Sequence, residues 1–201
     1  MGQETHGPGG ESETHAGPTK QQIELVWQKL ADVERYSVNV TEMAEKYLEK
    51  ERKVVIDLGA HRRWVNSTLD NLKRRDEEIM ADWEDVDFIQ SADARRGLTD
   101  DEAALEVDER KFAQDRRREQ SSLTEEITAV LQLRSEVDEV VFQLTNARNA
   151  LKAEVPAGVP EEIRDAIKLA TGELRATRGL KDHLRQDASL HSAVMYLRNL
   201  S

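Results

Sequence analysis

Apolar residues recur at alternating spacings of three and four from residue 23 onwards, which is the pattern of a helix with one buried seam. The first stretch of this seam consists of Ile23, Val26, Leu30, Val33, Val40, Tyr47, Val54 and Leu58. No proline interrupts the pattern before about residue 94, and Gly59 is the one glycine within it. Thr19 and Gln22 have the spacing of a capping box at the start of a helix. The pattern therefore predicts one long helix over about residues 19–95.

The seam changes its phase close to Gly59. Beyond that point the companion position of the heptad turns polar, at His61, Thr68 and Arg75. A new companion row takes over, with Leu69 and Trp83 alongside Val65, Leu72, Ile79 and Val86. A change of phase of this kind is a stutter, which locally unwinds a coiled coil. We therefore expect a kink, a hinge or an altered supercoil near Gly59.

Two short stretches have the residues of helix ends. In "RRGLTDDE", residues 95–102, Gly97 suits the position after a helix and Thr99 with Glu102 suits the start of the next. This predicts a hairpin turn at residues 97 and 98 and a second helix over about 99–154. "VPAGVPEE", residues 155–162, then predicts a second turn and a third helix over about 160–199.

The second helix has an uneven seam. Its late part is regular, but the stretch "EVDERKFAQDRRREQ" is almost without apolar positions apart from Val107, Phe112 and Ala113. The predicted fold is therefore all-α: an elongated antiparallel bundle or coiled coil of three long helices (about 19–95, 99–154 and 160–199). Residues 1–18 contain no large apolar residue after Met1 and are expected to form a disordered tail.

Short turns make successive helices antiparallel neighbours, so the predicted turns also predict which segments meet. A turn at residues 97 and 98 brings Val155 level with Val40. Residues 19–201 then form a single elongated domain with a three-helix zone (41–80, 115–154 and 160–199), a two-helix tip (81–114) and an overhang (19–40). The overhang has no partner in its own chain under this prediction.

An apolar seam that its own chain leaves uncovered is an association site. The predicted partner-binding residues are Ile23, Val26, Trp27, Leu30, Val33, Tyr36 and Val40. The tip offers a possible second contact patch, made of Trp83, Phe88, Ile89, Leu98 and Leu105. The tip residues have an equal alternative role, which is to hold the hairpin shut. Likewise, the overhang seam could be covered if the third helix ended early or folded differently.

The amino-acid composition favours an elongated shape and limits the classes of partner that the protein is expected to bind. Only 4% of the 201 residues are aromatic while 34% are charged, and the mean hydropathy is -0.71. The net charge of -11 and the pI of about 5.0 disfavour binding to nucleic acid or to anionic lipid. The sequence has no cysteine, no apolar run long enough to cross a membrane and no segment like a signal peptide. We therefore expect a cytoplasmic protein that is neither secreted nor transmembrane.

The sequence contains no recognisable motif for catalysis, phosphate binding or metal binding. His61, His183 and His191 lack the neighbours of a metal site, since no glutamate stands three residues before any of them. No phosphate-binding glycine loop and no nucleophile elbow occur. We therefore expect a protein that has no catalytic residues, binds no cofactor and no metal, and is not an enzyme.

The sequence thus favours a structural, scaffold or adaptor protein that self-associates or binds partner helices through coiled-coil seams, as a subunit of a larger assembly. The alternative is a membrane-binding or membrane-shaping dimer, which the three long helices resemble in architecture only. They also resemble a three-helix spectrin-like repeat, although their unequal lengths depart from that pattern.

Overall fold

The computed structural model describes residues 17–89 and 92–199, without the side chains of residues 86–89, 181–187 and 198–199. Four helices make up almost all of this described part, which contains no strand: α1 (Lys20–Ile89), α2 (Ala92–Glu154), α3 (Glu161–Thr171) and α4 (Arg175–Asn199). The prediction of an all-α chain with long helices is confirmed. The predicted number of three helices is wrong, because the region of the predicted third helix contains two separate helices, α3 and α4. The predicted tail lies outside the described residues except for its last two positions.

The start of α1 follows the predicted capping chemistry. The Gln22 backbone N–H donates to Oγ1 of Thr19 over 3.3 Å, and the Thr19 backbone N–H donates to Oε1 of Gln22 over 2.8 Å. These reciprocal bonds satisfy two backbone donors that the first turn of a helix leaves without partners. From this cap α1 runs as unbroken helix through Gly59.

The reversal between the first two helices differs from the predicted one. The first helix ends at Ile89 and the second begins at Ala92, about one heptad before the predicted turn, and Gly97 is inside α2. Thr99 does not cap a helix; its hydroxyl donates to the backbone carbonyl of Arg95 over 3.0 Å, one turn earlier in the same helix. The residues of "RRGLTDDE" are thus helical in the structure, although their types are typical of helix ends. Moving the turn by one heptad keeps both seams in phase, so the seam pattern alone does not distinguish the two positions.

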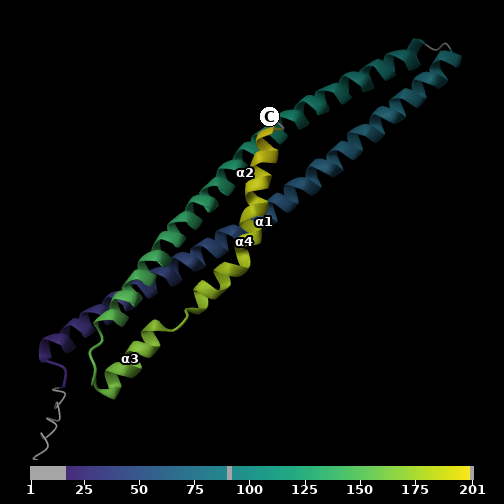
Figure 1. Ribbon diagram of the computed structural model, residues 1–201. Helices are drawn as coiled ribbons and strands as arrows, with labels where there is room; N and C mark the ends of the chain where they lie inside the picture. Colours follow the sequence, from purple (N-terminus) through teal and green to yellow (C-terminus); the bar gives the residue numbers. More distant parts are fainter. Residues whose placement is uncertain (1–16, 90–91, 200–201) are drawn as a thin grey trace, which may run out of the picture. The chain divides into compact units, whose positions relative to one another are not determined.

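The new turn changes which residues meet. Each residue of α1 now faces a part of α2 about two heptads earlier along α2 than predicted, as the ion pair between Arg75 and Asp108 shows. Figure 1 shows the two helices running in opposite directions from this reversal. The predicted alignment of Val155 with Val40 is therefore wrong, because the neighbouring Tyr36 lies beside Gln143 and Asn146 of α2.

The described chain divides into two compact units. The first takes the segment up to Asn39 and Val140–Glu173, and the second takes Val40–Glu139 and the segment from Leu174 onward. In the first unit the start of α1 packs against the end of α2, which in turn contacts the end of α3 through Arg148. Val26 and Val33 are 0% exposed there. The prediction that residues 19–40 overhang without a partner in their own chain is therefore wrong, because the shifted turn lets the end of α2 reach them.

In the second unit α4 packs against α1 and α2. Its inward side chains are buried, and they are Leu180, Leu190, Ala193, Val194 and Leu197. Facing them is a core from the other two helices that includes Tyr47, Val54, Ile127, Val130 and Val137. Heptad spacing on all three helices accounts for this packing.

The break between α3 and α4 is held by an arginine from another helix. Gly172 leaves the helix with an extended backbone (φ -61°, ψ 157°). Nε of Arg148, in α2, donates to the Ala170 carbonyl over 3.2 Å, and its Nη2 donates to the Gly172 carbonyl over 2.5 Å. The side chain thus satisfies carbonyls that the end of α3 leaves without partners. Burial away from water lowers the pKa of the Arg148 guanidinium below its ordinary value.

None of the helices, as far as they are described, combines the length and the apolar character needed to cross a lipid bilayer.

Candidate functional site: an open groove on the helical hairpin

A groove runs along one face of the hairpin that α1 and α2 form in the second unit. It consists of two adjoining hollows of about 300 and 350 Å³ that share Trp64. Its α1 wall is Asp57, Ala60, His61, Trp64, Thr68, Asn71, Leu72 and Arg75. Its α2 wall is Asp108, Lys111, Phe112, Asp115, Glu119, Ser122, Leu123 and Glu126. We call this surface the hairpin groove.

Helical geometry explains why these residues share a face. On each wall they follow one another at spacings of three and four, which places them on one stripe of a helix. The stripe from Asp57 to Arg75 extends about 27 Å at 1.5 Å per residue. The stripe that meets α4 begins one position later, at Leu58, and therefore points about 100° away around α1. No described side chain of α4 lines the groove.

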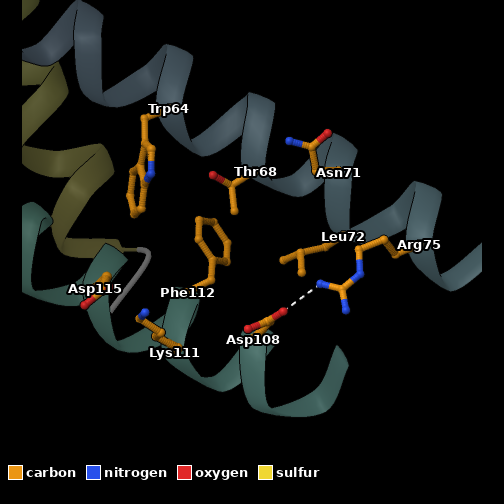
Figure 2. A pocket seen from close by; sticks show the side chains of 9 residues that line it. All are labelled: Trp64, Thr68, Asn71, Leu72, Arg75, Asp108, Lys111, Phe112 and Asp115. Carbon is orange, nitrogen blue, oxygen red and sulfur yellow. Dashed lines mark hydrogen bonds and ion pairs between the residues drawn. The ribbon is translucent and has the colours of Figure 1, made fainter. Parts of the chain in front are cut away.

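The floor of the groove is aromatic. Figure 2 shows Trp64, Thr68 and Leu72 projecting from α1 toward Phe112 of α2. The ring centroids of Trp64 and Phe112 lie 5.3 Å apart with the planes tilted by 55°, and those of His61 and Trp64 lie 5.6 Å apart. Tilted contacts at these distances are favourable for aromatic rings. Phe112 is buried, whereas Trp64 is only half-buried and leaves part of its ring on the surface.

An ion pair and a histidine–carboxylate contact cross the groove and hold its walls in register. Nη1 of Arg75 lies 2.6 Å from Oδ2 of Asp108, and Nδ1 of His61 lies 3.0 Å from Oε2 of Glu119 (Figure 2 shows the first). His61 is buried and Glu119 is exposed, so the second contact joins a buried imidazole to a carboxylate at the surface. Both contacts join residues of α1 to residues of α2 at the same alignment of the helices.

The groove forms where the seams of both helices are weak. His61, Thr68 and Arg75 are the positions at which the seam of the first helix turns polar, and all three line it. They face the almost seamless start of α2, where Phe112 is the main large apolar residue. Two strong seams would close on each other, but these two leave space between the helices. The polar interruption of the seam is the sequence signal for this site, whereas Trp64 and Phe112 have no role in the sequence-based prediction of contact residues.

The predicted partner-binding residues have mixed positions. Val26, Leu30, Val33 and Val40 are at most 3% exposed and form core. Ile23 and Tyr36 are partly exposed, and Trp27 is 50% exposed. Contact of these three with a partner stays a prediction, whereas the buried four are not available on this surface.

The predicted tip patch is largely used within the hairpin. Leu98 and Leu105 are buried, and Nε1 of Trp83 donates to Oε1 of Glu102 on the facing helix over 2.6 Å. These contacts fit the alternative in which the tip residues hold the hairpin shut. The side chains of Phe88 and Ile89 lie outside the described part.

A smaller cavity of about 160 Å³ lies on the α4 side of the hairpin, lined by residues that include Leu58, Val65 and Leu197. Two polar atoms beside it, Nε of Arg116 and Oε1 of Gln120, are buried without a hydrogen-bond partner in the described structure. No cluster of three or more possible metal ligands occurs in the described part of the chain.

No family model matches the chain, no curated protein is significantly similar to it, and no solved structure matches it.

Proposed function

We propose that this protein is a non-enzymatic helical scaffold or adaptor that binds a helix of a partner protein in the hairpin groove and thereby joins a larger assembly. The observation that carries the proposal is the groove itself. Two antiparallel helices present parallel walls with an aromatic floor, and a partner helix would lie over this floor as a third helix.

The shape of the groove suits a helix better than a small substrate. It is long and open along its length, with the two hollows end to end. Helix-binding grooves recognise side chains at i, i+3, i+4 and i+7 of an amphipathic partner. Residues of both groove walls follow the same spacing, so a helix lying over the groove would complete a three-helix packing of the coiled-coil kind.

The exposed part of Trp64 suits an anchor position. Tryptophan is enriched among the residues that dominate binding energy, and such residues lie near the centre of an interface. Trp64 belongs to both hollows and so lies at the middle of the hairpin groove. A large apolar side chain of the partner would cover it together with Leu72.

Ser121 and Ser122 offer a matched test, because the chain contains no cysteine. Both are exposed serines of α2, but only Ser122 lines the groove. Ser122→Cys and Ser121→Cys would each carry an environment-sensitive dye and be titrated with an amphipathic helical peptide of about 20 residues with leucines at heptad spacing. We expect a saturable response from the dye at 122 and little from the dye at 121. Equal responses, or none with any flanking charge on the peptide, would reject helix binding at the groove.

A further inference from the structure

We infer that the partner helix is basic, with lysine or arginine flanking its apolar stripe. This inference rests on the proposed function, because it names the chemistry of the helix that the hairpin groove accepts. It follows from the charges on the groove walls and from their pairing.

The groove is lined by an excess of carboxylates. Five acids line it, and they are Asp57, Asp108, Asp115, Glu119 and Glu126. Two side chains that are cationic at neutral pH, Arg75 and Lys111, oppose them. Among the described residues, Asp57 and Asp115 have no ion-pair partner, and Lys53 approaches Glu126 only at 4.0 Å. The rims therefore carry uncompensated negative charge on both walls.

The acids and the apolar floor are arranged as an amphipathic helix would require. Trp64, Leu72 and Phe112 form the apolar floor, while Asp57 and Asp115 line the groove from α1 and α2 respectively. A helix with its apolar face on this floor would bring its flanking positions beside the rims. Complementary charge at those positions speeds association and excludes wrong partners.

The same charges argue against a second copy of this chain as the occupant. A two-fold symmetric contact would place each groove against its own copy, because such an interface uses the same patch on both subunits. Acidic rims would then face acidic rims, and like charges brought together across an interface oppose binding. A different protein with a basic helix has no such conflict.

The test compares three helical peptides that share one apolar stripe and differ only in their flanks, which carry lysine, glutamine or glutamate. Binding to the full chain would be measured by fluorescence anisotropy at two salt concentrations. We expect the lysine peptide to bind about tenfold or more tightly than the glutamine peptide and to lose affinity as salt is raised. The glutamate peptide is expected to bind most weakly.

Paired charge variants separate local recognition from general attraction to an acidic protein. Asp57→Asn with Asp115→Asn removes two groove charges, and Asp70→Asn with Glu109→Gln removes two exposed charges beside it that do not line it. We expect about a two- to fivefold loss of lysine-peptide affinity for each groove charge removed and little loss in the control. Equal loss in both variants would overturn the inference.

The remaining outcomes distinguish this inference from the proposed function. If the three peptides bind equally tightly, the groove binds helices but does not select basic ones, and the inference alone is wrong. If no peptide binds, both are wrong. If the chain instead forms a dimer whose contact includes Trp64, a second copy is the occupant.

Discussion

The guanidinium of Arg75 and the carboxylate of Asp108 lie 2.6 Å apart and join α1 to α2 across the hairpin groove. This contact fixes an alignment that the capping residues alone do not predict. The same alignment brings the end of α2 over the apolar start of α1 and leaves the weak seams of both helices facing each other. Burial of the first seam and opening of the groove are thus two consequences of one register.

Substitution of Gly97 tests the position of the reversal by the sign of its effect. If Gly97 lies within α2, Gly97→Ala stabilises the protein by about 0.5–1 kcal/mol, because alanine is the better helix former and nothing lies within 4 Å of the added methyl group. If Gly97 instead followed the end of a helix in a left-handed conformation, alanine would destabilise it. Urea unfolding of the two proteins measures the difference.

Gly158 provides the opposite control for that experiment. Its φ of 81° lies in the left-handed region, where an L side chain costs roughly 1 kcal/mol or more. We therefore expect Gly158→Ala to lower the free energy of unfolding while Gly97→Ala raises it. Destabilisation by both would move the reversal back to residues 97 and 98.

The sequence was sufficient for the helical class, for the start of α1 at the Thr19–Gln22 box and for the turn after α2. The sequence was insufficient to predict the register between α1 and α2, because two turns one heptad apart preserve the same apolar seams. The residues better suited to cap helices lie at the turn position that the structure does not use. The choice depends on contacts distant in sequence, such as His61 with Glu119. It was also insufficient for the break at Gly172, which depends on Arg148 from another helix.

Leu105 decides between the two roles considered for the hairpin tip. It is 6% exposed, so Leu105→Ala should lower the free energy of unfolding by about 2–4 kcal/mol through lost burial and a residual cavity. Val107→Ala, at a side chain that is 59% exposed, should change it by less than about 0.5 kcal/mol. Thermal unfolding would show this. If the Leu105 variant is as stable as the unmodified protein, the tip residues do not hold the hairpin shut, and their predicted role as a contact patch is favoured.

Gln120 is predicted to be less stabilising than an apolar side chain of its own size. It is 5% exposed, and its Oε1 has no hydrogen-bond partner in the described structure. Gln120→Met removes that unpaired polar atom and should raise the free energy of unfolding by about 1–2 kcal/mol. Gln114→Met, at an exposed site of α2, is the control and should have little effect. A loss of stability at 120 would show that the amide has a partner.

Arg148 is predicted to hold the end of α3. Arg148→Met removes two hydrogen bonds from a charged donor to backbone carbonyls and should cost about 1.5–3 kcal/mol. Arg148→Lys should recover only part of this, because an ammonium group lacks the planar fork of guanidinium. Amide hydrogen exchange should report faster exchange in α3 of the methionine variant. Lys152→Met, at an exposed position, is the control, and equal exchange in both variants would contradict the role.

The proposal that a basic helix binds in the hairpin groove is tested by finding where a bound helix lies. A lysine-flanked peptide with one benzophenone in its apolar stripe would be photo-crosslinked to the intact protein, and the adducts would be located by mass spectrometry. Binding in the hairpin groove predicts adducts on the groove walls, around Trp64 to Arg75 of α1 and Asp108 to Leu123 of α2. Adducts confined to α4 or to the start of α1 would contradict it, because the helix would then bind outside the hairpin groove.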